Sequence, residues 1–179
     1  MARKPADQSV NREDIIMAAA DVLHRNGYEA TTMKDIAAEV NLTAASLYHH
    51  FRNKDMLVLA VLEEGIGRAI ELMTPIVNSA QSPAEKLREM VRVHVTGVAE
   101  HTSVGAAMVF EIRSLLTTKD TPRNVANFDD EAHNEFLSRR AHFFAQRDEF
   151  EGLFEQVVQT GIDTGDFADP DTGIFVKTM

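Results

Sequence analysis

The chain has 179 residues and a formal net charge of −10, with 44% apolar residues, 26% charged residues and no cysteine. This length suits one domain or two small ones that share a core, and the composition is that of an ordinary globular protein without disulfides or cysteine chemistry. No window reaches the ~18 apolar residues of a membrane span, and the basic start lacks the apolar stretch of a secretory signal, so we expect a cytoplasmic protein without membrane contact.

The negative charge is concentrated after the first third of the chain. Residues 1–55 carry seven Lys/Arg and eight Asp/Glu, whereas residues 56–179 carry eleven and twenty. An acidic chain does not bind nucleic acid through bulk positive charge. If nucleic acid is a partner, the contact must therefore be local, and the acidic remainder should face away from it.

Apolar residues recur at helical spacing almost throughout, and no run shows the alternation of a strand, so the predicted fold class is all-α. Residues 1–10 are expected to be a disordered basic arm. A first helix is predicted from about Asn11 to Asn26, and Gly27 stops it as a left-handed residue. The predicted buried face of this helix consists of Ile15, Ala19, Val22 and Leu23.

Two short helices are predicted next. Thr32 is a suitable N-cap, with Asp35 three residues later as in a capping box. Asn41 and Leu42 are expected to form a tight turn before Thr43 caps a third helix. Two short helices joined by a turn and preceded by a stabilising helix are the geometry of a helix-turn-helix, although other helical bundles also contain short helices.

The remaining sequence predicts a helical body. A long fourth helix is expected, capped by Asn53 and ended by Pro75, and a fifth helix should run from the Ser82-Pro83-Ala84-Glu85 start to about His101. A sixth helix over 104–116 and a loop over 117–127 should follow. The last expected elements are a long helix that Gly165 closes and a helix that begins at Asp169-Pro170. Because the chain leaves this last helix after a few residues, at Met179, we interpret it as truncated.

Two stretches of the first third carry a specific pattern. Residues 27–37 read GYEATTMKDIA, and residues 42–54 read LTAASLYHHFRNK. Together, over about residues 12–60, they resemble the TetR family of bacterial one-component transcriptional regulators. The resemblance implies an N-terminal three-helix helix-turn-helix DNA-binding head, joined by a long fourth helix to a helical ligand-binding and dimerisation body. We expect the head at residues 1–55 and the body at residues 56–179.

The resemblance also assigns DNA contacts to the head. The candidate residues are Thr32, Thr43, Ala44, Ala45, Ser46, Tyr48, His49, His50 and Lys54. The threonines would hold phosphate or serve only as N-caps, Tyr48 would reach the backbone or pack in the core, and Lys54 would pair with phosphate as a point charge or remain solvated. Each histidine would contact phosphate or remain solvated.

The recognition helix departs from the family at its exposed start. Many members carry a lysine where Ala44 stands, and bases are usually read by Arg, Lys, Asn or Gln. Alanine and serine allow only limited direct readout. We therefore expect specificity to depend on DNA shape, or on Arg3 and Lys4 entering the minor groove from the basic arm, which could also be an ordinary tail.

The resemblance implies that the body binds a small effector. Candidate ligand-binding residues are Met73, His94, Val98, His101, Met108, Glu111 and Ile112, and the expected aromatic walls are Phe136, Phe143, Phe144 and Phe150. Stripes of this kind are more often plain core. For Arg139, Arg140 and Arg147 a charged helix face is expected, the alternative being contact with the phosphates of an acyl-coenzyme A.

No cofactor and no metal is expected. His94 and His101 stand seven residues apart on a helix, which separates them by about 10 Å, too far for one ion. The sequence also lacks a nucleophile–base pair, a glycine-rich phosphate loop and a paired His–Glu metal motif, so an enzyme is not expected.

These observations predict a DNA-binding transcriptional regulator. We expect a homodimer that binds a palindromic operator in double-stranded DNA and acts as a repressor that a small hydrophobic ligand, such as a fatty acyl-CoA, releases. The alternative to a repressor is an activator, which would use the same DNA-binding head, so the sequence does not distinguish the two. The alternative is an architectural or nucleoid DNA-binding protein whose body binds a protein partner rather than a metabolite.

Overall fold

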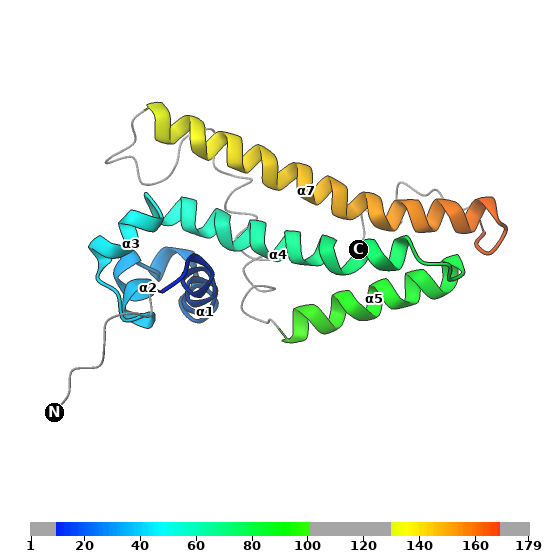
Figure 1. The fold of residues 1–179 in the computed structure, drawn as a ribbon, viewed down its shortest axis with the longest axis horizontal. Helices are drawn as coiled ribbons and strands as arrows, with labels where there is room; N and C mark the ends of the chain where they lie inside the picture. Colours follow the sequence, from blue (N-terminus) through cyan, green and yellow to red (C-terminus); the bar gives the residue numbers. More distant parts are fainter. Residues whose placement is uncertain (1–9, 101–129, 169–179) are drawn as a thin grey trace.

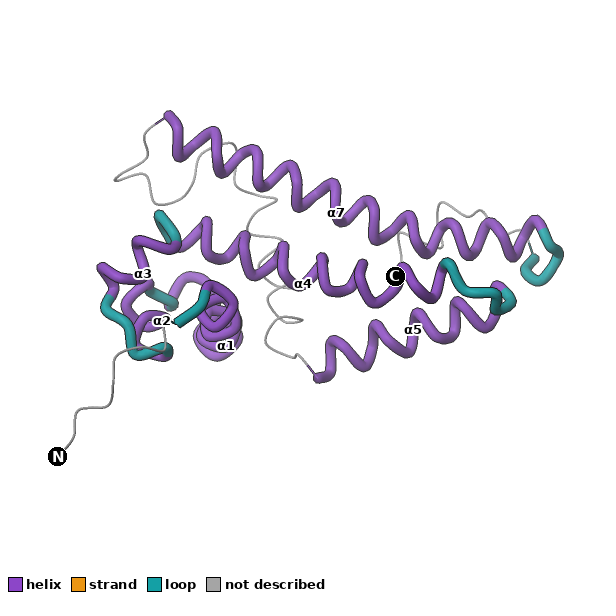
Figure 2. Tube along the Cα trace, viewed as in Figure 1, coloured by secondary structure: helices purple, strands orange, loops and turns teal. Residues whose placement is uncertain are grey.

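The computed structural model describes residues 10–100 and 130–168 of the chain, and within these ranges it contains helices and their connections but no strand (Figures 1 and 2). The predicted all-α class is confirmed. The helices are α1 (Arg12–Ala30), α2 (Met33–Glu39), α3 (Ala44–His50), α4 (Lys54–Val77), α5 (Pro83–Glu100) and α7 (Asp130–Asp163). Residues 1–9 of the predicted basic arm, the sixth helix, the loop and the last helix lie outside the described residues, and so do His101, Met108, Glu111 and Ile112.

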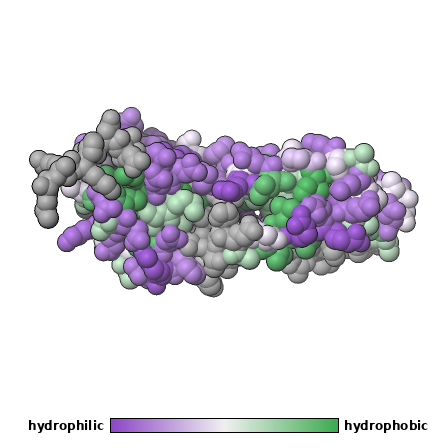
Figure 3. All heavy atoms as spheres, turned by 60° about the horizontal axis from the view of Figure 1, so that its bottom comes forward, coloured by the Kyte–Doolittle hydropathy of each residue, from purple (hydrophilic) through white to green (hydrophobic). Residues whose placement is uncertain are grey.

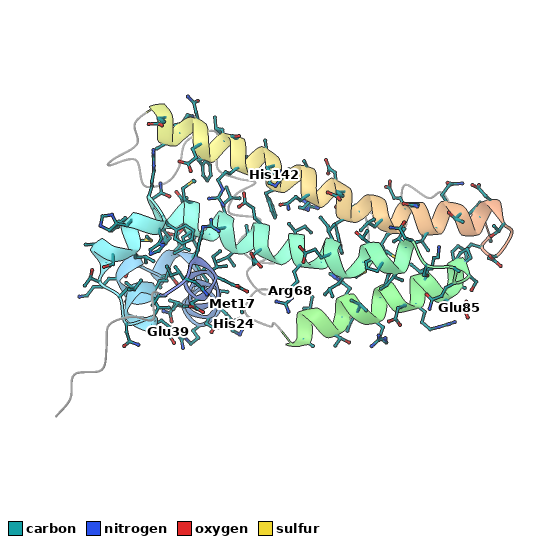
Figure 4. All side chains as sticks on the ribbon, in the orientation of Figure 1. Met17, His24, Glu39, Arg68, Glu85 and His142 are labelled. Carbon is teal, nitrogen blue, oxygen red and sulfur yellow. The ribbon has the colours of Figure 1, made fainter. Side chains whose placement is uncertain are left out.

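The molecule is elongated, with a head at one end. Helices α1, α2 and α3 form the head, and α4 runs from it along the molecule with α7 at its side (Figure 1). Helix α5 packs against α4 and α7 in the part remote from the head. Figure 4 shows this separation through two labelled carboxylates, Glu39 of α2 in the head and Glu85 of α5 at the opposite end.

Helix α1 has the start and the break that its sequence predicts. Asn11 Oδ1 accepts a hydrogen bond of 2.7 Å from the Asp14 N–H, and the Asp14 carboxylate accepts one of 3.2 Å from the Asn11 N–H. Gly27 has φ of 72° and interrupts the helix, after which one more turn runs to Ala30. The four residues predicted to share a buried face are all buried. Capping and backbone conformation thus determine both ends of the long part of α1.

Helix α4 continues past Pro75, so the predicted end at this proline was wrong. Proline has no N–H and loses one helical hydrogen bond. The last turn nevertheless closes, because the Asn78 N–H donates to the Thr74 carbonyl at 3.1 Å and the Ser79 N–H donates to the Ile76 carbonyl at 3.1 Å. Val77, in this turn, is buried.

Two apolar clusters form the core. The first contains the buried residues of α1–α3, the first half of α4, and Phe136 and Phe143 of α7. The second consists of Met73, Val77, Met90, Phe154 and Val157. Phe136 and Phe143, for which a pocket wall was the alternative to plain core, are therefore core residues beside the head. The division at residues 55 and 56 stays a prediction, and the core that supports the head extends into α4 and α7.

An ion pair also attaches α7 to the head end of α4. The Arg139 guanidinium donates twice to the Glu63 carboxylate, with Nε at 3.2 Å from Oε1, and both side chains are mostly buried. Arg147 pairs with Glu151 at 2.7 Å within α7. Two of the arginines for which a phosphorylated ligand was the alternative are thus engaged in ion pairs inside the protein.

The end of α7 folds back on itself. Gly165 has φ of 80°, and the Phe167 N–H donates to the Gly161 carbonyl at 3.0 Å. The Phe167 ring then covers Gly161 so closely that a Cβ at Gly161 would overlap it. A Cβ at Gly152, in the same helix, would meet nothing within 4 Å. The two glycines therefore differ in what an added methyl group would do.

Gly161→Ala should lower the free energy of unfolding by about 1–3 kcal/mol, because the methyl group displaces the Phe167 ring. The matched change Gly152→Ala should raise this free energy by up to about 1 kcal/mol, since alanine is the better helix former. Urea unfolding followed by circular dichroism measures both. Equal stabilisation by the two substitutions would show that the ring does not occupy the space over Gly161.

Candidate functional site

Helices α2 and α3 have the geometry of a helix-turn-helix. Thr32 and Asp35 form the predicted capping box at the start of α2. The turn that follows contains Asn41 in the left-handed region, with φ of 56°, and the Leu42 N–H donates to the Ala37 carbonyl at 2.8 Å. Leu47 anchors α3 in the head core. The chain thus holds α3 against α2 by its turn and by one buried side.

The opposite side of α3 faces solvent. Tyr48 is 51% exposed, which excludes the alternative that it packs in the core. Ala45, His49 and His50 are also exposed, whereas Ala44 and Ser46 are half-buried. The structure therefore exposes four of the α3 residues that the sequence assigned to DNA contact, whereas Thr32 and Lys54 belong to α2 and α4. Contact between these residues and DNA stays a prediction.

Both threonines serve as N-caps. The Thr32 hydroxyl donates to the Asp35 carboxylate at 2.6 Å and accepts from the Asp35 N–H at 3.2 Å. Hydrogen bonds from the Thr32 hydroxyl and backbone hold the pKa of Asp35 below its ordinary value. Thr43 Oγ1 accepts from the Ser46 N–H at 3.0 Å. Phosphate contact by either hydroxyl, in addition to capping, stays a prediction.

Lys54 has partners inside the protein. Its Nζ donates to the Tyr28 carbonyl at 2.6 Å and to the Thr31 carbonyl at 2.9 Å, and it lies 4.0 Å from the centre of the Tyr28 ring. The neighbouring Asp55, which is buried, accepts a hydrogen bond from the Tyr28 hydroxyl. Sequence reasoning missed this arrangement. It joins residues more than twenty positions apart, and no local spacing signals such a contact.

The candidate ligand residues that the structure describes lie in two settings. Met73 is buried in the second cluster, beside Met90 and Phe154. His94 and Val98 lie on the exposed side of α5. The His94 ring packs against Phe150, with centroids 5.4 Å apart, and Phe150 packs against both clusters. Met73 and His94 are therefore connected through aromatic packing.

An apolar strip lies on α5. Val91, Val95 and Val98 follow one another at helical spacing and are exposed, and Figure 3 shows hydrophobic residues gathered on the face that includes this helix. A cavity of about 20 Å³ lies where α5 begins, beside Val77 and Val157, and has room for about one water molecule. An open cleft of about 190 Å³ has a mostly charged lining, made by Arg12, Ala60, Glu63, Glu64, Gly67, Arg68 and Glu71. Neither space is suited to a hydrophobic effector.

Among residues 10–100 and 130–168 no three side chains of the metal-binding types converge. None of the helices within these ranges is long and apolar enough to cross a membrane.

Partial burial lowers the pKa of His94, because an apolar environment disfavours the charged imidazolium. A histidine whose pKa is lower in the folded state stabilises the fold above its unfolded pKa, and this stability is lost as the pH falls below that value. The unfolding free energy should therefore fall more between about pH 7.5 and about pH 5.5 in the unmodified protein than in His94→Phe, which keeps a ring against Phe150. Identical losses in urea titrations would exclude a titrating His94.

The head has the clearest similarity to known proteins. Residues 15–61 match the family model described as bacterial regulatory proteins, tetR family. Over 83 residues the chain is 34% identical to the transcriptional repressor KstR2 of Mycolicibacterium smegmatis, a match that covers 46% of this chain and 40% of the relative. It is 26% identical over 99 residues to the fatty acid metabolism regulator protein of Bacillus subtilis, covering 55% and 51%. The matched stretches thus span about half the length of these relatives.

Solved structures share the fold over more of the chain. The structure of AibR in complex with isovaleryl coenzyme A and operator DNA superposes with a TM-score of 0.71 at 24% identity, covering 93% of this chain and 80% of that one. The regulator FadR of Bacillus subtilis in complex with stearoyl-CoA superposes with a TM-score of 0.66 at 18% identity, covering 94% and 80%. These likenesses extend the shared fold from the head to the body.

Proposed function

Because this chain belongs, through its residues 15–61, to the tetR family of bacterial regulatory proteins, we propose that it is a DNA-binding transcriptional regulator. One observation carries the proposal: the matched residues form the helix-turn-helix, whose second helix, α3, is anchored by Leu47 and exposes Tyr48, His49 and His50. The exposed face lies in the part of the chain with the least negative charge. A local contact with DNA is therefore compatible with an acidic protein.

The proposed interface follows the two short helices. Its residues are Thr32, Thr43, Ala44, Ala45, Ser46, Tyr48, His49 and His50. We propose a palindromic operator bound by a homodimer, since one head can read only one half-site, and two copies of α3 would then lie about 34–36 Å apart.

Selection from a random pool of duplex DNA tests this proposal. The purified full chain should enrich an inverted repeat whose half-sites are centred about one helical turn apart. Enrichment of a single half-site would contradict the dimer. A pool that stays random would contradict sequence-specific DNA binding and favour the architectural alternative.

We further propose a small hydrophobic effector of the acyl thioester class. Support comes from the relatives, because both superposed regulators are described with a coenzyme A thioester. The chain adds its own features: the His94 ring on Phe150, the buried Met73 and the exposed apolar strip of α5. An effector can shift the DNA-competent state only by its differential affinity for two conformations, typically about 1–3 kcal/mol of coupling.

Release of a labelled operator by fatty acids and acyl thioesters of graded chain length tests the effector. Acyl thioesters should release the unmodified protein, and His94→Phe should shift the concentration needed. An unchanged response of His94→Phe would exclude His94 from the site. Release by none of these compounds would exclude this effector class and favour a body that binds a protein partner.

A further inference from the structure

Tyr28 is held at three points by two consecutive residues. Lys54 donates to its carbonyl at 2.6 Å and places the ammonium 4.0 Å from the ring centre, and Asp55 accepts from its hydroxyl. The same ammonium donates to the Thr31 carbonyl at 2.9 Å. Tyr28, Thr31 and Asp55 are all buried. We call these four residues the clasp.

The clasp lies where α4 leaves the head. Tyr28 belongs to the last turn of α1, directly after the kink at Gly27, and Lys54 and Asp55 form the first turn of α4. The apolar residues that follow on α4 pack into the head core, but apolar packing is not directional. Hydrogen bonds are directional, and those to charged groups are the stronger ones. The clasp is therefore suited to fix the angle between the head and α4.

We propose that Tyr28, Lys54 and Asp55 are positioning residues, which set the direction in which α4 leaves the head, and that Lys54 acts through this clasp and not by holding a phosphate. The inference rests on the proposed DNA binding. A helix of 24 residues is about 36 Å long, so a change of about 10° at its start moves its far end by ~6 Å. In a dimer joined through the body, the same change displaces one α3 relative to the other.

The salt dependence of DNA binding separates the two roles of Lys54. Loss of a phosphate contact lowers the slope of log K against log salt by about 0.9, whereas loss of a positioning contact lowers affinity at an unchanged slope. Lys54→Ala should bind the selected palindrome about tenfold more weakly with the slope of the unmodified protein. A slope lower by about one unit would overturn the assignment of Lys54 to positioning.

The sign of the effect at Asp55 provides a second test. Asp55→Asn removes a negative charge, which by electrostatics alone would strengthen DNA binding. The clasp instead predicts weaker binding, because the neutral amide oxygen of asparagine accepts a weaker hydrogen bond from the Tyr28 hydroxyl than the charged carboxylate does. The matched control is Glu39→Gln, which removes a negative charge from the exposed Arg25–Glu39 pair of the head and should leave binding unchanged or stronger. Strengthening by Asp55→Asn would overturn the proposal.

Positioning is distinguished from mere folding by comparing two duplexes. Tyr28→Phe keeps the ring and the carbonyl that Lys54 contacts, and removes only the hydroxyl that Asp55 accepts from. It should weaken binding to the complete palindrome about tenfold but leave binding to an isolated half-site unchanged, because each head is intact. Equal weakening on both duplexes would show a structural defect of the head and overturn the proposal.

The distance between the head and the body, measured without DNA, tests the clasp independently of the proposed DNA binding. The chain contains no cysteine, so spin labels can be attached through Ala38→Cys on α2 and Arg88→Cys on α5, both exposed, in protein diluted with unlabelled copies. Tyr28→Phe and Asp55→Asn should broaden or shift the head-to-body distance distribution, and Glu39→Gln should not. If the unmodified protein bound no DNA while this shift occurred, the proposed function would fail and the clasp would stand. An unchanged distribution in Tyr28→Phe and Asp55→Asn would overturn the clasp.

Discussion

Phe143→Ala should lower the free energy of unfolding by about 3–5 kcal/mol, although residue 143 lies almost ninety positions after the head. Its side chain is 0% exposed and belongs to the apolar cluster that contains Ile15, Ile36 and Leu47 of the head. Removing the ring leaves a cavity between α7 and this cluster. Chemical unfolding measures the loss, and hydrogen exchange should show weaker protection of α1–α3 as well as of α7.

The neighbouring Phe144 provides the control. It is half-buried and packs against the same cluster from its edge, so Phe144→Ala should cost clearly less than Phe143→Ala. If the two substitutions cost the same, or if Phe143→Ala left the protection of the head unchanged, α7 would not be part of the core that supports the head.

Ala45→Glu should weaken DNA binding by roughly 100-fold or more, because it places a carboxylate on the exposed face of α3 that we propose to contact the DNA. The fold should not suffer. Residue 45 is the second residue of α3, where a negative charge interacts favourably with the helix dipole. Fluorescence anisotropy with the selected palindrome measures affinity, and thermal unfolding checks that stability is retained.

The matched control is Ala141→Glu, which adds the same charge to an exposed position of α7 outside the head. It should change DNA affinity by a small factor only, since exposed charges more than about 10 Å apart are largely screened at moderate salt. Similar losses in both variants would mean that the added charge acts through the overall field and that α3 is not the reading helix.

Local signals in the sequence predicted most of the helix starts. The caps at Thr32, Thr43 and Asn53, the helix start near Asn11 and the break at Gly27 all depend on residues within three or four positions of one another. Side chains at that spacing meet whatever the rest of the fold does, so the sequence contains the necessary information. The buried face of α1 was predictable for the same reason, since helical periodicity is local.

Contacts between distant residues were not predictable in this way. The pairing of Tyr28 with Asp55 and of Arg139 with Glu63 joins residues 27 and 76 positions apart, and each side chain alone reads as an ordinary helix residue. Phe143 was recognised as apolar, but whether it formed plain core or the wall of a ligand pocket was left open. Periodicity shows which face of a helix is buried, but not what that face is buried against.

In the candidate site, too, local features were predictable and contacts between distant residues were not. The specific pattern of the head indicated α3 as the reading helix, and its exposed face agrees with the placement of Ala45 and Tyr48. The role of Lys54 was inferred by resemblance, whereas its hydrogen bonds depend on the tertiary arrangement of α1 and α4. A lysine at a helix start has the same sequence signature whether it meets a phosphate or two carbonyls.

Site-directed disulfide cross-linking tests most directly whether α3 enters the DNA. The chain has no cysteine, so Ala45→Cys and Ala141→Cys each supply a single thiol. Each variant is mixed with the selected palindrome carrying a thiol tethered to one base of a half-site, under exchange conditions. We predict efficient cross-linking of Ala45→Cys, lost when the tethered base lies outside the half-sites, and none of Ala141→Cys. Equal cross-linking of both variants, or none of Ala45→Cys on a duplex that the protein binds, would contradict DNA reading by α3.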